Sequence, residues 1–293
     1  MIEYEKLKNW TFDEVERRYT EKDAILYALG VGIGIDPVDS GQLRFVYEKD
    51  LRALPTMAVV LAYPGFWVKN PATGIDWVKV LHGEHSIVLH RPLSASGTVV
   101  GRSRVTALVD KGKDRGALLY TEHKVYARPA DELLATTETV AFCRGDGGFS
   151  ERPGNGPKGG DPMPPPKLPE PTTPPEISVD LPTSPQAALL YRQSGDLNPL
   201  HADPEVARAA GFARPILHGL ATFGLAGHAL LRLFCNYDPA RLKSMSLRFS
   251  APVFPGETVR TEAWRDGERV RFRARTIGQR DVVVLSHGVA ELT

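Results

Sequence analysis

The sequence predicts an α+β protein made of two similar units, each an antiparallel sheet wrapped around one buried helix. Three observations support this prediction. Two stretches far apart in the chain resemble each other, a segment rich in glycine and proline lies between them, and in each half strand-like segments follow one apolar helix.

The Gly- and Pro-rich segment covers residues 145–176. Seventeen of its 32 residues are Gly or Pro. Such a composition cannot sustain a helix or a central strand, so we expect an extended connector here. It divides the chain into an N-terminal unit, residues 1–144, and a C-terminal unit, residues 177–293.

The signals that begin and end a helix occur once in each unit. Thr20 precedes "EKDAILYALG", which ends at Gly30. Ser184 precedes "PQAALLYRQSG", with Pro185 at the first helical position and Gly195 at the end. The segments "RPLSASGTVV" and "APVFPGETVR" also correspond, one in each unit. These similarities predict a duplicated domain.

The C-terminal unit has the clearer helix-and-sheet pattern. Residues 219–234, "GLATFGLAGHALLRLF", are apolar on nearly every face, so we expect a buried helix. Four strand-like segments follow, with a hairpin signal at residues 266–267. In the N-terminal unit we expect the helix near Pro55–Tyr63 and strands from Ile87 to Arg128. One buried helix inside an antiparallel sheet is the hot-dog arrangement, so two copies predict a double hot-dog fold.

Composition narrows the class of protein. The net charge of +1 gives no long-range attraction for nucleic acid or an anionic membrane. The N-terminus has no apolar signal-peptide core, and no apolar run approaches the length of a membrane span. Cys143 and Cys235 lack partners at metal-binding spacing and suggest a reducing compartment. We therefore expect a cytoplasmic protein, with an organelle matrix as the alternative.

One polar loop stands out as the candidate site. "YRQSGDLNPLH" brings Asp196, Asn198 and His201 close together, between Gly195 and Pro199. Polar loop residues between apolar segments often carry function. The alternative is an ordinary surface turn, because the same residue types build turns.

The run from this loop to residue 219 resembles the (R)-specific enoyl-CoA hydratase family, also called hydratase 2 or MaoC-like dehydratases. The matching positions are Gly195, Asp196, Asn198, Pro199, His201, Gly211, Phe212, Pro215, Ile216, His218 and Gly219. "RFSAPVFPGE" matches a further segment. "YALGVGIG" and "VLHGEH" resemble the first half of double hot-dog hydratases, the type found in peroxisomal multifunctional enzyme type 2.

The resemblance implies interconversion of trans-2-enoyl-CoA and (3R)-3-hydroxyacyl-CoA, with no cofactor beyond the CoA of the substrate and no metal. His201 suits the role of base, because an imidazole is largely neutral yet basic near neutral pH. Asp196 can hold the same water and relay a proton, and the sequence leaves the division of work between the two open. Asn198 orients the water or braces the turn.

Charge that develops on the thioester oxygen needs a donor. Gly219 begins the buried helix, where main-chain N–H groups lack intrahelical acceptors and the helix dipole is positive. We therefore expect Gly219 to supply the oxyanion donor. His218 beside it binds or positions the substrate, or serves the fold.

The N-terminal unit has no counterpart of the Asp196–His201 pair. We expect it to be catalytically inactive, and the resemblance implies that it holds a medium, long or bulky acyl chain. His82 and Gly83 are candidates to line that pocket, and a buried structural histidine is the alternative.

Three further features are basic or glycine-rich. Lys243 and Arg248 are candidates for the CoA phosphates on charge alone. Four arginines alternate along one strand and either meet CoA or form a solvated face: Arg269, Arg271, Arg273 and Arg275. "GVGIG" at residues 30–34 is no dinucleotide loop, because it follows a helix rather than a strand.

Two other functions remain open. Hot-dog domains also hydrolyse acyl-CoA, so a thioesterase is the enzymatic alternative, and a non-catalytic acyl-CoA binding protein is the other. A homodimer is expected, because partners commonly close exposed sheet edges. If the source is eukaryotic, the peroxisomal matrix is the expected location.

Overall fold

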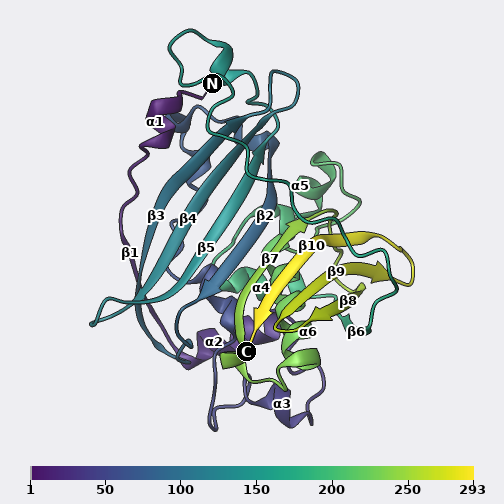
Figure 1. Ribbon diagram of the computed structural model, residues 1–293. Coiled ribbons are helices and arrows are strands. Elements are labelled where there is room, and N and C mark those ends of the chain that lie inside the picture. The colour runs from purple at the N-terminus through teal and green to yellow at the C-terminus, as the bar shows by residue number, and fades with distance from the viewer. Residues whose placement is uncertain (1) are drawn as a thin grey trace.

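A computed structural model describes residues 2–293, and its main feature is one antiparallel sheet of ten strands (Figure 1). The strands run in the order β1-β3-β4-β5-β2-β7-β10-β9-β8-β6. The first five belong to the first half of the chain and the last five to the second. The pairing of β2 with β7 joins the two halves into one surface. The double hot-dog prediction is confirmed, with its two sheets joined edge to edge.

The strands have these bounds: β1 Val15–Tyr19, β2 Val80–Leu89, β3 Gly97–Asp110, β4 Ala117–Ala127, β5 Glu132–Cys143, β6 Ile177–Pro182, β7 Leu242–Phe249, β8 Thr258–Asp266, β9 Arg269–Ile277 and β10 Val283–Leu292. The α-helices are α1 Tyr4–Lys8, α2 Glu21–Gly30, α3 Ser40–Leu43, α4 Ala187–Tyr191, α5 Pro204–Ala209 and α6 Gly219–Phe234. The 3₁₀ helices are η1 Pro55–Val60, η2 Trp67–Lys69, η3 Pro71–Thr73, η4 Trp77–Lys79, η5 Phe149–Glu151, η6 Arg192–Ser194, η7 Pro199–His201 and η8 Pro239–Arg241.

The predicted buried helix is α6, which begins and ends where the sequence places it. It lies behind the sheet in Figure 1, and eleven of its sixteen residues are buried. Its glycines allow close packing between the halves. A Cβ on Gly224 would lie 2.5 Å from Val31 at the end of α2, and one on Gly227 would lie 2.6 Å from Thr56 of η1. The central helix of the second half is therefore also part of the core of the first half.

The helix of the first half differs from the prediction. The Pro55–Tyr63 segment forms only the six-residue 3₁₀ helix η1. Val59 and Val60 are β-branched and disfavour an α-helix, and Pro64 disfavours helical geometry at the residue before it. The strands also extend beyond the predicted limits, because β2 begins at Val80 and β5 ends at Cys143.

The two helix-start signals lead to different results. Thr20 caps α2 as predicted, since its main-chain N–H and its hydroxyl both donate to Asp23 Oδ2 at 2.7 Å. The helix after Ser184 begins at Ala187, two residues later than expected, and spans only five residues. Pro185 and Gln186 form a turn, in which the Gln186 N–H donates to Ser184 Oγ at 3.2 Å.

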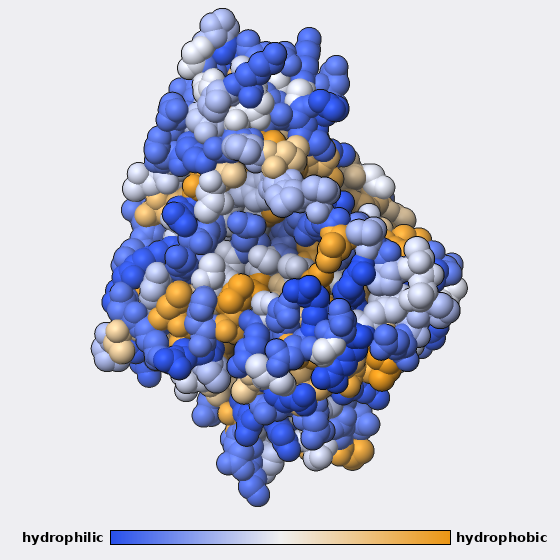
Figure 2. Space-filling model, viewed as in Figure 1, coloured by the Kyte–Doolittle hydropathy of each residue, from blue (hydrophilic) through white to orange (hydrophobic). Residues whose placement is uncertain are grey.

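The segment between the halves has two parts. Residues 145–161 pack with the N-terminus around buried Phe149, in a second small core that also contains Ile2, Tyr4 and Leu7. Residues 162–175 contain no helix or strand and cross the outer face of the sheet, the face seen in Figure 1. That face is mostly hydrophilic, with scattered hydrophobic patches (Figure 2).

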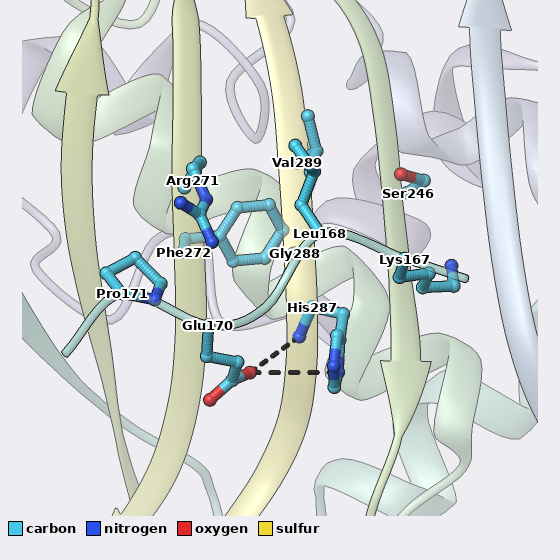
Figure 3. Close-up of a pocket in the computed structure, with 10 residues that line it drawn as sticks. All are labelled: Lys167, Leu168, Glu170, Pro171, Ser246, Arg271, Phe272, His287, Gly288 and Val289. Atoms are coloured by element: carbon cyan, nitrogen blue, oxygen red, sulfur yellow. Dashed lines mark hydrogen bonds and ion pairs between the residues drawn. The ribbon is translucent and has the colours of Figure 1, made fainter. Parts of the chain in front are cut away.

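Ion pairs and hydrogen bonds fasten the crossing segment to the sheet. Lys167 pairs with Glu84 of β2 at 2.9 Å, and the main-chain N–H of His287 in β10 donates to Glu170 Oε1 at 2.7 Å. Figure 3 shows Lys167 and the contact between Glu170 and His287 around a cavity of about 110 Å³ beneath the segment. The glycine- and proline-rich stretch is therefore a strap held against the protein.

Among the described residues, no helix is both long enough and apolar enough to cross a membrane.

Candidate active site

The loop between α4 and α5 presents Asp196 and His201. The chain turns at Gly195, whose φ of 128° lies in the left-handed region that favours glycine. Asn198 then begins η7. Its main-chain N–H donates to Asp196 Oδ1, and its Oδ1 accepts from the Leu200 N–H, both at 3.1 Å. These bonds hold the loop with the Asp196 side chain exposed and His201 buried.

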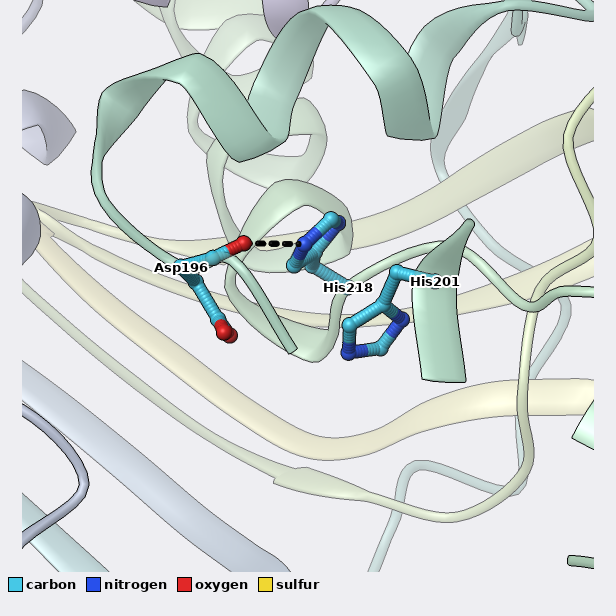
Figure 4. Close-up of side chains that lie close together, drawn as sticks. All are labelled: Asp196, His201 and His218. Atoms are coloured by element: carbon cyan, nitrogen blue, oxygen red, sulfur yellow. Dashed lines mark hydrogen bonds between the residues drawn. The ribbon is translucent and has the colours of Figure 1, made fainter. Parts of the chain in front are cut away.

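Asp196, His201 and His218 lie around one small space (Figure 4). One oxygen or nitrogen atom of each side chain lies within 4.8 Å of the others. His201 Nδ1 is 2.9 Å from the carbonyl oxygen of Ile216. A carbonyl only accepts, so Nδ1 carries the proton and Nε2 keeps a free lone pair. The arrangement therefore provides a neutral base next to a carboxylate.

His218 contacts both of the other residues. Its ring stacks on that of His201, with centroids 3.7 Å apart and planes inclined by 27°. Its Nε2 donates to the main-chain oxygen of Asp196 at 3.1 Å. The residue lies just before α6, so the start of that helix fixes the spacing of the loop residues.

Burial keeps both imidazoles neutral. Loss of solvent lowers the pKa of His201, while the Ile216 carbonyl and the Asp196 carboxylate oppose that shift. For His218, burial and then repulsion from His201 lower the pKa to about 4. Both rings are therefore unprotonated at neutral pH, as proton abstraction from water requires.

The start of α6 offers a main-chain donor. The N–H groups of Ala221 and Thr222 donate to the His218 oxygen. The Gly219 N–H makes no hydrogen bond within residues 2–293. A Cβ on Gly219 would lie 3.4 Å from the ring of Phe249, so this ring lies beside the start of α6. The geometry suits an oxyanion donor.

A β-bulge directs His82 toward the same region. The register of β2 against β5 shifts between His82 and Glu84, so Gly83 is the extra residue. A Cβ on Gly83 would lie 3.1 Å from the Val140 oxygen, a close approach that favours glycine. The bulge places His82 on the same face as His85, and its ring lies 4.6 Å from that of Phe249. The first half therefore meets the start of α6.

The two predicted CoA-phosphate residues lie apart from the cluster. Arg248 pairs with Glu84, its Nη2 lying 2.8 Å from Oε1. Side chains alternate along a strand, so Arg248 points away from the face that Phe249 occupies. Lys243 lies six residues from Phe249 at the other end of β7, roughly 20 Å along the strand. The structure brings neither into contact with Asp196 or His201.

The alternating arginines of β9 lie on the outer face, and each has an oxygen partner. The partners are Glu291 for Arg269, the Pro169 carbonyl for Arg271, Glu262 for Arg273 and Asp281 for Arg275. The four arginines therefore form a solvated face of the sheet, the second of the two alternatives that the sequence left open.

The same three side chains are the group within residues 2–293 that could share a metal ion, namely Asp196, His201 and His218. On each histidine one nitrogen already donates to a carbonyl, which leaves one nitrogen per ring for any ligand.

Sequence reasoning missed two residues near the site. His85 of β2 is buried, and its ring meets that of Phe223 in α6 at 5.0 Å. The bulge at Gly83 hides the shared face of His82 and His85 from a simple period-two reading. Arg192, in the loop itself, donates to the Leu197 oxygen at 3.1 Å and has a buried Nε without a partner. Its position in a polar loop gave no distinguishing signal.

Comparisons with known proteins place both halves of the chain in one family. The MaoC like domain family matches residues 167–286, and the MFE-2 hydratase 2 N-terminal domain family matches residues 18–145. The chain is 38% identical to "Enoyl-CoA hydratase 2, peroxisomal" of Arabidopsis thaliana over 93% of this chain and 90% of that protein. It is 37% identical to "Peroxisomal multifunctional enzyme type 2" of Mus musculus, over 91% of this chain and 35% of that longer protein.

A solved structure gives the same result for the fold. The MaoC-like dehydratase of Phytophthora capsici superposes with a TM-score of 0.85 at 34% identity, covering 99% of this chain and 98% of that one. The similarity spans both halves and the strap between them. The chain belongs to the enoyl-CoA hydratase 2 family, the double hot-dog branch of the MaoC-like dehydratases.

Proposed function

We propose that this enzyme is a hydro-lyase that adds water to a trans-2-enoyl-CoA and forms a (3R)-3-hydroxyacyl-CoA. The observation that carries the proposal is the free Nε2 of His201, close to the Asp196 carboxylate and to the start of α6. Family membership supports the reaction class, because relatives are named enoyl-CoA hydratase 2. The 3R configuration is carried over from the family.

In the proposed mechanism, one water lies between Asp196 and His201. His201 Nε2 takes its proton while the water oxygen bonds to C3 of the substrate. The electron pair of the C2=C3 bond moves toward the thioester oxygen, which the Gly219 N–H stabilises. The proton that His201 took from the water is then delivered to C2, which regenerates the neutral imidazole, and the sum is the addition of one water. Asp196 holds the water and relays the proton, and Asn198 braces the loop.

The two halves have different proposed roles. The unit of residues 177–293 carries the reacting groups. The unit of residues 1–144 holds a medium, long or bulky acyl chain, with His82 and Gly83 in the pocket wall, and residues 145–176 connect the two. His218 positions the pair, and Lys243 and Arg248 remain candidates for the CoA phosphates. No cofactor is needed beyond the CoA of the substrate.

The assembly and location are also proposals. Strands β1 and β6 form the two edges of the sheet, and exposed edges favour pairing with another chain, so we propose a homodimer. The proposed location is the cytoplasm or, if the source is eukaryotic, the peroxisomal matrix. The names of two relatives mention the peroxisome.

Incubation with crotonyl-CoA and a longer enoyl-CoA tests the reaction. Hydration removes the enoyl absorbance without releasing free thiol, and chiral analysis of the product checks the 3R configuration. Release of thiol would instead indicate the thioesterase alternative. Binding without any chemical change would indicate the non-catalytic alternative.

A further inference from the structure

The inner face of the first half of the sheet is unusually polar. His85 on β2 lies opposite Thr139 on β5, with His85 Nδ1 3.1 Å from the threonine hydroxyl. His123 on β4 lies opposite Ser103 on β3, with Nδ1 2.9 Å from the serine hydroxyl. The corresponding face of the second half carries no histidine on these strands and is mostly apolar, with Met245, Leu247, Val270, Phe272 and Ala274 beside the buried threonines Thr261 and Thr276. The two inner faces therefore suit different contents.

Two nitrogens on this polar face have no hydrogen-bond partner among residues 2–293. They are the Nε2 atoms of His82 and His85, and both are buried. Their rings lie edge to face, with centroids 5.3 Å apart. His123, in contrast, has a partner at each nitrogen, because its Nε2 lies 3.1 Å from the Leu61 oxygen. A buried polar atom without a partner is costly, so a ligand group that satisfies it gains affinity.

Of the two histidines with unpartnered nitrogens, His82 lies nearer to the reaction site and His85 lies farther from it. The His82 ring contacts Phe249, whose ring lies beside Gly219. The His85 ring lies farther along α6, against Phe223, which is four residues beyond Gly219. A substrate with its thioester oxygen at Gly219 and its acyl chain directed into the first half passes His82 and then His85.

We propose that the preferred substrates carry a hydroxyl or carbonyl oxygen on the acyl chain a few carbons beyond the double bond, where it bonds His82 or His85. This inference rests on the proposed function and specifies its substrate class. A plain hydrocarbon chain in the same place covers both nitrogens and leaves them unsatisfied. A hydroxyl fits either tautomer of the rings, because it both donates and accepts.

A neutral oxygen group suits these histidines better than a carboxylate. Burial lowers the pKa of His82 to about 4 and lowers that of His85 well below its usual value. The charged group that acts on the pKa of His82 is the Asp196 carboxylate, while Glu84 contributes only a main-chain hydrogen bond. A carboxylate on the acyl chain would therefore meet the negative charge of Asp196 and two neutral imidazoles.

The test compares two enoyl-CoA substrates of equal size, 5-hydroxy- and 5-methyl-trans-2-hexenoyl-CoA, by kcat/KM of hydration. We expect the hydroxyl substrate to be favoured about tenfold in the wild type, which corresponds to about 1.4 kcal/mol. In His85→Phe, where the aromatic packing on Phe223 is kept, the preference should disappear. In Thr261→Val, a change of one buried polar residue in the second half, it should remain.

Because each measurement is a ratio within one variant, a general loss of active protein cancels. His82→Phe serves as a second variant if His85→Phe does not fold, and it too should lower the preference. Equal kcat/KM for both substrates in the wild type would overturn the inference while leaving hydration itself established. A preference that survives both substitutions would overturn it as well. No hydration of either substrate would overturn the proposed function and this inference together.

Discussion

Each half contributes five strands to the sheet, but the two halves differ in the helix that covers these strands. The second half has the sixteen-residue α6, and the first half has the six-residue η1. Helix α6 reaches the core of both halves, since Gly224 and Gly227 contact Val31 and Thr56. A single long helix therefore supports both sheets, which leaves part of the inner face of the first half free for polar residues.

The corresponding loops differ in the same way. In the second half, Asn198 caps η7 and holds Asp196 near His201. In the first half, Asp39 caps α3, and its Oδ1 accepts from the Gly41 N–H at 2.8 Å. No histidine lies between residues 31 and 54. The pairing of β2 with β7 builds the first half into the same sheet, although this half has no counterpart of the Asp196–His201 pair. In the proposed function, the second half carries the chemistry and the first half provides the binding surface.

The largest expected effect comes from the carboxylate. Asp196→Asn should lower kcat by roughly 10²–10⁴-fold, because the water loses its anionic partner. The thermal midpoint should change little, since the side chain is exposed and asparagine can still accept from the Asn198 N–H. Steady-state hydration kinetics and thermal melts check both expectations.

The matched control is Asp36→Asn, an exposed aspartate in the corresponding loop of the first half, whose Oδ1 accepts from the Val38 N–H at 3.2 Å. It should leave kcat near the wild-type value. Equal losses in the two variants would break the distinction between an active and an inactive half.

The next effect tests the main-chain donor. Gly219→Pro removes the N–H and should lower kcat by about 10²–10³-fold. Proline is tolerated at the first helical position, and His218 has φ −58° and ψ 139°, a conformation suited to the residue before proline. Gly219→Ala keeps the N–H and places its Cβ 3.4 Å from Phe249, so it separates crowding from loss of the donor. If both variants lost activity equally, the oxyanion role of Gly219 would be refuted.

Much of this arrangement follows from sequence patterns. The Asp196–His201 loop and the boundaries of α6 were predicted, because a polar turn and an apolar run depend on local residue chemistry. The side chains that meet across the sheet were not. The common face of His82 and His85 depends on the bulge at Gly83, and register is set by pairing between strands far apart in the chain.

The sequence also did not predict that the helix of the first half is short, or that the strap is bound to the sheet. The nine residues from Pro55 to Tyr63 satisfy a helix pattern in isolation, and their β-branched content decides the outcome only together with packing against α6. The strap is fixed by Lys167 and Glu170, whose partners lie on strands far away in the sequence. Composition predicts its lack of regular structure, and tertiary contacts decide that it is bound.

The pH dependence gives a smaller effect with a definite sign. Neutral His201 is the active form, and burial lowers its pKa below the usual 6.5. The kcat/KM should therefore stay constant above that value and fall about tenfold per pH unit only below the lowered pKa. Asp196 opposes this shift, so the residual activity of Asp196→Asn should have its acidic limb at still lower pH. A wild-type limb above pH 6.5 would contradict a buried imidazole base.

The smallest effect concerns the two caps and compares the halves directly. Asn198→Ala removes the acceptor for the Leu200 N–H, and Asp39→Ala removes that for the Gly41 N–H. Each should lower the free energy of unfolding by about 0.5–2 kcal/mol, because each cap satisfies main-chain donors at a helix start.

Asn198→Ala should also lower kcat about tenfold, since 1.4 kcal/mol of lost loop positioning corresponds to that factor. Asp39→Ala should not change kcat, because nothing in its loop faces the reacting atoms. Denaturant unfolding and hydration rates measured on the same preparations separate the two outcomes, and a kcat loss in Asp39→Ala would mean that the halves are coupled through the sheet.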